Sequence, residues 1–190
     1  MRIVFFGPNG SGKGTQATLL KSELKVPHIS TGDLLRAAVK AGTPLGLRAK
    51  AVMDTGKLVS DEIVLSMLEE RLAAADVGGG FILDGYPRNL VQCAALEDLL
   101  ARLRQPLDIA IKLDVPDSAI LARCELRFAA EHRPDDDPAI VRKRLQVYAE
   151  QTAPVAEHFA DMGKLATVDG VGDVNTVFAR ILAVLPRVPA

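Results

Sequence analysis

The chain has 190 residues, of which 48% are apolar and 25% are charged. Its 23 Lys and Arg against 24 Asp and Glu give a formal net charge of -1, without the basic excess typical of nucleic-acid binding proteins. The length favours a single domain with small insertions, and the apolar fraction is too high for a disordered chain.

Short apolar runs rich in β-branched residues alternate with longer helical patterns along the chain. The predicted strands are Ile3–Phe6, Pro27–Ile29, Phe81–Leu83, Ile109–Leu113 and Leu165–Val168. The predicted helices are Lys13–Leu24, Ile63–Ala75, Leu90–Leu103, Asp117–Phe128, Ala139–Met162 and Val174–Leu185. Continuously apolar strands separated by helices indicate a doubly wound α/β fold with a parallel sheet covered on both faces.

Two segments do not fit this alternation. Ser30–Val59 is helical without a strand, and we expect it to protrude as an insertion. Phe128–Pro138 is polar and acidic, and we expect a loop that feeds a helix capped by Asp137 with Pro138 at its first position. Both segments are candidates for moving parts on a rigid scaffold.

The most specific local pattern is the loop from Gly7 to Thr15, which contains GxxxxGK ending at Lys13. Such loops bring backbone N–H groups and a helix N-terminus against a phosphate, while the lysine adds a full positive charge. A predicted strand precedes the loop and a predicted helix follows it, as this function requires. The residue after the lysine is Gly14, so the hydroxyl that usually follows appears one position later, at Thr15.

Cys93 and Cys124 are too few for a disulfide framework or a four-cysteine zinc site, and we expect both to be buried free thiols. The N-terminal apolar run is too short for a signal peptide. The sequence also has no run of about 18 apolar residues, the length that a membrane-spanning helix needs. We therefore expect a cytoplasmic protein with neither a membrane nor a nucleic acid as partner.

Several motifs in a fixed order resemble those of the adenylate kinases in their short-lid form, within the nucleoside monophosphate kinase family. The motifs are Gly7–Gln16, Ser30–Arg36, Gly56–Val59, Phe81–Arg88, Gln92, Arg123, Arg127, Arg133, Asp135–Asp136 and Arg142–Leu145. The resemblance implies a doubly wound five-stranded parallel sheet of the P-loop kinase type. It also implies a monophosphate-binding insertion at 30–59, a short lid at 128–138 and reversible Mg²⁺-dependent transfer from ATP to AMP, which gives two ADP.

The resemblance also implies roles for individual residues. The catalytic set would be Lys13, Asp84, Arg88, Arg127, Arg133 and Arg144. The ATP-binding set would be Gly10, Ser11, Gly12, Lys13, Gly14, Thr15, Arg123, Arg127 and Gly172. The AMP-binding set would be Thr31, Arg36, Lys57, Leu58, Val59, Gly85, Tyr86, Pro87, Arg88, Gln92, Arg133 and Arg144. No side chain would bind a metal directly, since Mg²⁺ would be held through water near Asp84.

These residue types suit phosphoryl transfer, which depends on positioning and on neutralising charge. The planar guanidinium of arginine binds phosphate oxygens in pairs and stays ionised. Arg123 and Arg127 are four residues apart on a predicted helix and so share one face. We expect Arg142 to be a surface residue, and one or two carboxylates of Asp135–Asp137 to pair with lid arginines when the lid closes.

The combination of Thr31 and Gln92 favours AMP, because a Gln amide offers both a donor and an acceptor to the adenine edge. A UMP/CMP kinase and a non-catalytic nucleotide sensor are the alternatives. Ser30 and Asp33 form a capping-box pattern. His28, His132 and His158 have no mutual metal spacing, and the lid segment is too short to hold a metal, so we expect no zinc. We expect a monomer.

Overall fold

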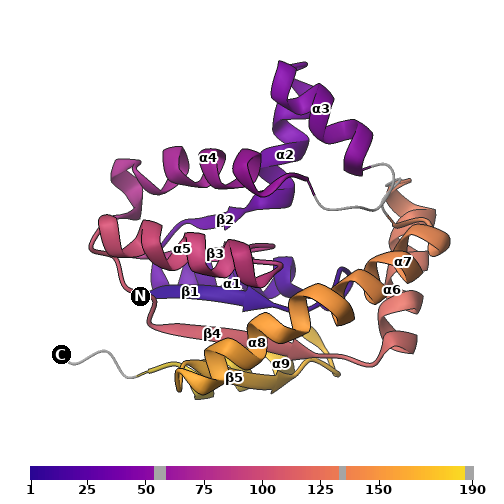
Figure 1. Cartoon of the computed structure of the whole chain (residues 1–190). Helices are drawn as coiled ribbons and strands as arrows, with labels where there is room; N and C mark the ends of the chain where they lie inside the picture. The colour runs from indigo at the N-terminus through magenta and orange to yellow at the C-terminus, as the bar shows by residue number, and fades with distance from the viewer. Residues whose placement is uncertain (54–58, 133–135, 187–190) are drawn as a thin grey trace.

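The computed structural model describes residues 1–53, 59–132 and 136–186. Within these ranges it contains one five-stranded parallel sheet in the order β2-β3-β1-β4-β5 (Figure 1). The strands are β1 (Arg2–Phe6), β2 (His28–Ser30), β3 (Phe81–Asp84), β4 (Ile109–Asp114) and β5 (Leu165–Asp169). The predicted parallel sheet is confirmed, and each predicted strand is found to within one residue at either end.

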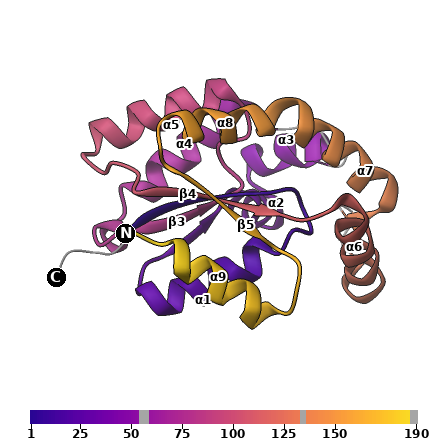
Figure 2. The same ribbon diagram turned by 90° about the horizontal axis from the view of Figure 1, so that it is seen from below.

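Helices connect the strands and cover both faces of the sheet. They are α1 (Lys13–Leu24), α2 (Thr31–Lys40), α3 (Pro44–Met53), α4 (Asp61–Leu72), α5 (Leu90–Arg102), α6 (Asp117–Glu131), α7 (Pro138–Val147), α8 (Ala153–Asp161) and α9 (Val174–Val184). Figure 2 shows α1 and α9 on one side of the sheet and α5 and α8 on the other. The doubly wound arrangement is therefore confirmed.

The central strand β1 is apolar on both of its faces because both are covered. Val4 and Phe6 pack into the core beneath α4, α5 and α8, whereas Ile3 and Phe5 pack into the core beneath α1 and α9. All four side chains are almost completely buried. A strand covered on both faces has no solvent side, which explains its continuous apolar run.

The strand order places β1 where the chain changes direction across the sheet. From β1 the chain goes to β2 and β3 on one side, and then crosses to β4 and β5 on the other. Ligands of open α/β sheets bind beyond the carboxyl ends of the strands at such a switch point. The Gly7–Gly12 loop lies there, between β1 and α1.

The two predicted insertions stand on either side of this position (Figure 1). One contains α2 and α3, and Ser30 caps α2 by accepting a hydrogen bond from the backbone N–H of Asp33 at 3.2 Å. The other contains the end of α6 and the start of α7. Asp137 caps α7 by accepting from the Ala139 N–H at 2.8 Å, with Pro138 in the first turn, which confirms the predicted helix start.

Three predicted boundaries are wrong. The loop predicted for Phe128–Pro138 is helical at its beginning, because α6 continues to Glu131 through residues with high helix propensity. The helix predicted over Ala139–Met162 is interrupted by a π-helical turn at Tyr148–Thr152. Pro154 cannot donate a backbone hydrogen bond and crowds the preceding turn, which favours this widening. The helix predicted at Ile63–Ala75 is α4, which runs from Asp61 to Leu72.

Candidate functional site

A polar cavity of about 550 Å³ lies at the carboxyl ends of β1, β2 and β3. Its walls include residues of the glycine-rich loop, α2, the segment that follows β3, α6 and α7. The predicted site residues among its lining are Gly10, Gly12, Lys13, Gly14, Thr15, Thr31, Arg36, Val59, Asp84, Gly85, Tyr86, Pro87, Arg88, Gln92, Arg127 and Arg144. Predicted sites for two ligands thus share one cavity.

Lys13 lies at the floor of the cavity, at the first position of α1. Its Nζ donates a hydrogen bond to the carbonyl of Pro8 at 2.9 Å, which folds the side chain back over the loop. Burial lowers the pKa of Lys13, although the Asp84 carboxylate opposes this effect. A bound anion would favour the charged ammonium, so the site is suited to phosphate.

Asp84 ends β3 and faces His28, the first residue of β2. The Asp84 Oδ2 atom lies 3.6 Å from His28 Nε2. Burial by itself would raise the pKa of Asp84, but the interaction with His28 and the positive charges of Lys13 and Arg88 outweigh it, so the pKa is lowered. Asp84 is therefore a buried carboxylate that stays ionised.

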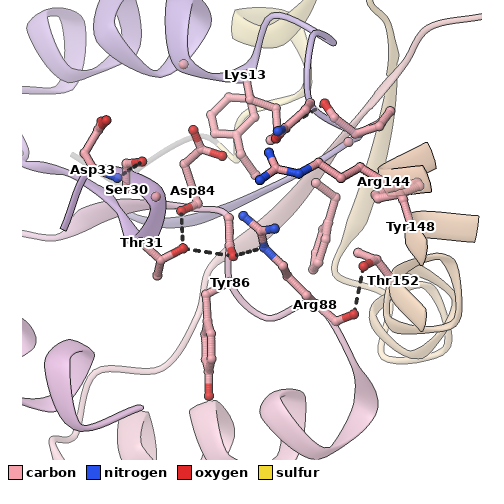
Figure 3. A pocket seen from close by; sticks show the side chains of 18 of the residues that line it. Lys13, Ser30, Thr31, Asp33, Asp84, Tyr86, Arg88, Arg144, Tyr148 and Thr152 are labelled. Carbon is pink, nitrogen blue, oxygen red and sulfur yellow. Dashed lines mark hydrogen bonds between the residues drawn. The ribbon is translucent and has the colours of Figure 1, made fainter. Parts of the chain in front are cut away.

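Arg88 is held by hydrogen bonds from three different directions. Its Nε donates to the carbonyl of Gly85 at 2.6 Å, and its carbonyl accepts from Thr152 Oγ1 at 2.7 Å. Its backbone N–H donates to Gln92 Oε1 at 2.7 Å. Figure 3 shows the Arg88 and Arg144 side chains extending into the same space beside Asp84 and Lys13. Residues far apart in the sequence thus converge on one point.

Gln92 lies in the first turn of α5 with both ends of its amide fixed. Its Oε1 accepts the Arg88 N–H, and its Nε2 donates to Asp61 Oδ1 at 2.6 Å. These bonds use one of the two amide N–H groups and one lone pair of the oxygen, so the amide has a defined orientation and further capacity. Thr31, the first residue of α2, also lines the cavity and donates to the carbonyl of Gly85 at 3.0 Å.

The side chains of two predicted residues in the cavity lining, Tyr86 and Arg36, have other surroundings. The Tyr86 ring is 1% exposed and points away from the cavity, between the helices packed on the sheet (Figure 3). Burial raises its pKa beyond the ordinary tyrosine range. Arg36 forms an ion pair with Asp33 at 2.6 Å on the more exposed side of the cavity.

On the lid side, Arg127 of α6 binds the carboxylate of Asp136 through Nε and Nη2. Asp136 is one of the three acidic residues of which we expect one or two to pair with lid arginines when the lid closes. Arg142 is exposed, as predicted, and Arg144 lines the cavity from the same helix.

Three predicted ATP-binding residues lie outside the lining of the cavity. Arg123 is close to the loop, since its guanidinium donates to the carbonyls of Ser11 at 3.2 Å and Gly170 at 3.1 Å. Ser11 is a buried residue of the loop itself, and Gly172 lies between β5 and α9. The predicted site residues Lys57, Leu58 and Arg133 are outside the described residues.

The cavity also contains residues that the sequence did not point to. Besides His28 and Thr152, its lining includes Glu131 and Tyr148. His28 is part of an apolar strand, and Thr152 lies in the interior of a long helical pattern. Neither position carries a motif, so three-dimensional contacts were needed to find them.

Cys93 and Cys124 are both buried free thiols, as predicted. None of the helices within the described ranges combines the length and hydropathy needed to cross a bilayer.

Comparison with known proteins places this geometry in context. A family model described as adenylate kinase matches residues 5–164. The chain is 58% identical to the adenylate kinases of Xanthomonas euvesicatoria pv. vesicatoria (strain 85-10) and Xanthomonas axonopodis pv. citri (strain 306). Each of these matches spans 187 residues, or 98% of this chain and 100% of the relative. It is 57% identical to the adenylate kinase of Stenotrophomonas maltophilia (strain R551-3) over 97% of this chain and 99% of the relative.

Proposed function

The chain belongs to the adenylate kinase family, and from that premise we propose how its residues align two nucleotides. The activity is reversible transfer of a phosphoryl group from ATP to AMP, which gives two ADP. The observation that supports the residue roles is the convergence of Lys13, Arg88, Arg127 and Arg144 on the cavity that also holds Asp84. Four cations around one space suit a reaction that depends on positioning and charge neutralisation.

The glycine-rich loop and Lys13 bind the ATP phosphates, and Arg123, whose guanidinium donates to the carbonyls of Ser11 and Gly170, lies against the ATP adenine. Gly10, Ser11, Gly12, Gly14 and Thr15 bring backbone groups against the phosphates, and Gly172 lies toward the adenine. Arg88 and Arg36 hold the AMP phosphate. Arg127, Arg144 and Arg133 surround the group that is transferred.

The AMP base lies between Thr31 and Gln92, with Lys57, Leu58 and Val59 beside it. Gln92 has a fixed amide with remaining donor and acceptor capacity, which matches the N1 and N6 edge of adenine. A pyrimidine would leave these buried groups unpaired, which disfavours UMP and CMP.

The family generally uses Mg²⁺ with ATP, and the donor chemistry of the cavity fits this ion. Asp84 offers carboxylate oxygen that remains ionised beside the loop, and Mg²⁺ prefers oxygen ligands and keeps much of its water. We propose that Asp84 holds the ion through water and that the short lid carries no zinc. Bound there, the ion would neutralise phosphate charge during transfer.

We propose that segments 30–59 and 128–138 close over the nucleotides and exclude water, since an open site would also hydrolyse ATP. Hydrogen exchange of both segments should slow when a two-nucleotide inhibitor binds. Equal protection with and without the inhibitor would contradict closure. We also propose a cytoplasmic monomer.

Substitution of Arg88 tests the proposed roles. Arg88→Ala should lower kcat for AMP-dependent ADP formation by about 10³-fold, because it removes a cation from the reacting phosphate. Arg142→Ala, on the exposed face of α7, is the matched control and should stay close to wild type. Near-normal turnover of Arg88→Ala would refute the assignment. Assays with AMP, CMP and UMP in turn distinguish a UMP/CMP kinase, and no turnover with any of them would indicate a sensor.

A further inference from the structure

A second cluster of chemically reactive side chains lies between α5 and α8, which pack against each other on one face of the sheet (Figure 2). Cys93 and Glu97 are four residues apart on α5 and share one face of it. His158 of α8 faces them, with its Nε2 2.9 Å from Glu97 Oε1. One ligand atom from each residue lies within 4.8 Å of the others, and in the described part of the chain this is the one group of three with such geometry.

We propose that Cys93, Glu97 and His158 bind a divalent cation of the zinc class, with a fourth position left to water. A thiolate and an imidazole favour Zn²⁺ and Co²⁺ over Mg²⁺, so this ligand set differs in kind from the carboxylate of the nucleotide cavity. No zinc was expected from the sequence, in which the histidines lack mutual metal spacing. The present site instead joins one histidine to a cysteine and a glutamate of another helix.

The separation of the ligand atoms is close to what a tetrahedral zinc site needs. Zn–S bonds of about 2.3 Å and Zn–N and Zn–O bonds of about 2.0–2.2 Å place the ligand atoms roughly 3.4–3.6 Å apart. The three ligand atoms lie within 4.8 Å of one another, so the side chains would have to rotate to reach that spacing. The cation would separate His158 from Glu97 slightly and draw Cys93 toward both.

Accessibility and charge are also compatible with a bound cation. The His158 and Glu97 side chains are 40% and 37% exposed, which gives an ion a route in from solvent, whereas Cys93 is 1% exposed. Glu97 also borders an apolar cavity of about 290 Å³ with Leu96 and Phe159. One thiolate and one carboxylate balance the two charges of the ion.

Without a metal the thiol is protonated, because burial and the nearby Glu97 charge raise the pKa of Cys93 to about 12. Binding therefore forms the metal–sulfur bond as the thiol proton passes to solvent. The bound ion would link α5, which begins with the turn that holds Gln92, to α8, which follows Thr152. We expect the ion to stabilise the fold beside the AMP wall, the proposed AMP-binding residues Thr31, Gly85 and Gln92. It would take no part in phosphoryl transfer.

Co²⁺ titration of the full-length protein, reduced and free of nucleotide, tests the site. One equivalent should produce thiolate-to-cobalt charge-transfer absorption, and Zn²⁺ should displace it. Cys93→Ser should abolish the absorption. His158→Gln should weaken binding by at least about 100-fold, because loss of a residue that only supports a ligand already weakens it roughly 10- to 100-fold. Cys124→Ser and His132→Gln, which change the other buried thiol and an exposed histidine, should leave it intact.

Thermal unfolding gives a second readout, whose signal does not come from the metal–thiolate bond. Zn²⁺ at 100 times its Kd should raise the Tm of the wild type by roughly 5–10 °C, and this rise should be lost in His158→Gln, a partly exposed substitution that the fold should tolerate. Absence of charge-transfer absorption at millimolar Co²⁺ would overturn the proposal. It would also be overturned if the Tm shift survived in His158→Gln and disappeared in His28→Gln, since that result would place the cation in the nucleotide cavity.

Discussion

Arg127 and Asp136 form a two-point ion pair across the lid, and Asp136 has no exposed side-chain surface. The pair uses the Nε–H and one N–H of Nη2. These are two of the five N–H groups that a guanidinium carries, and both lie on one edge of its plane. Asp136 therefore fixes the plane of Arg127 through that edge, and the Nη1 atom takes no part in the pair.

Asp136→Asn should lower kcat by roughly 10- to 100-fold, because misplacing a positioning group by about 1 Å costs on the order of 10²-fold. Loss of the buried charge should also lower the Tm. Steady-state kinetics well below the Tm separate the two effects. The control is Asp137→Asn, which removes the adjacent charge but keeps a good cap for α7. An unchanged kcat in Asp136→Asn would show that the pair serves stability alone.

Asp61 should act on base selection through Gln92, because it accepts the Gln92 amide N–H at 2.6 Å. Asp61→Ala removes one of the two hydrogen bonds that fix the amide, and kcat/KM for AMP should fall roughly 10-fold or more, as expected for loss of a hydrogen bond to a charged group. Gln92→Asn shortens the side chain proposed to hydrogen-bond the AMP base. It should therefore weaken the preference for AMP over pyrimidine monophosphates.

The control for Asp61→Ala is Glu62→Ala, an exposed carboxylate in the same helical turn. It should retain wild-type kinetics with AMP. If Asp61→Ala also keeps them, then Gln92 does not depend on Asp61 for its orientation.

Much of the fold could be predicted from the sequence, because each of these elements is indicated by one local sequence pattern. Buried strands such as Ile3–Phe6 are continuous apolar runs, and the loop before Lys13 carries its own motif. The break at Tyr148–Thr152 shows what such patterns miss. Pro154 signals a disturbance, but whether a proline kinks a helix or widens one turn depends on how α7 and α8 pack.

The site was predicted as a set of residues without their mutual positions. The roles of Arg88 and Arg144 came from a family resemblance, whereas their convergence is a property of the folded chain (Figure 3). His28 could not be found at all, since its relation to Asp84 arises from the pairing of β2 with β3. Contacts between distant elements leave no local signal in a single sequence.

Asp84 should make stability depend on acid pH. Its pKa is lower in the folded protein than the ordinary value of 3.8, so its stabilising contribution is present above that value and is lost as the pH falls through the lower folded pKa. Between about pH 5 and 3 the Tm of the wild type should therefore fall more steeply than that of Asp84→Asn. Asp114→Asn, at the exposed end of β4, should follow the wild-type curve. Parallel curves for wild type and Asp84→Asn would contradict this assignment.

Residue 85 should have to be glycine for efficient use of AMP, because there is no room for a side chain at this position. A Cβ there would lie 2.8 Å from Thr31 Oγ1 and 3.1 Å from Arg88 Nη2, on a backbone with φ of +84°. Gly85→Ala should displace both side chains, and strain of about 1–3 kcal/mol corresponds to a roughly 10- to 100-fold fall in kcat/KM for AMP. KM for ATP should change by less than about 3-fold, because Lys13 and the loop are not displaced.

Gly42→Ala is the control that separates backbone strain from side-chain contact as the cause of a defect in Gly85→Ala. Gly42 also has a positive φ, of +64°, but a Cβ added there would meet no heavy atom within 4 Å beyond its chain neighbours. Gly42→Ala should therefore show the cost of the backbone conformation alone, measured as the change in kcat/KM for AMP. Equal losses in the two variants would assign the defect to backbone strain rather than to contact with Thr31 and Arg88.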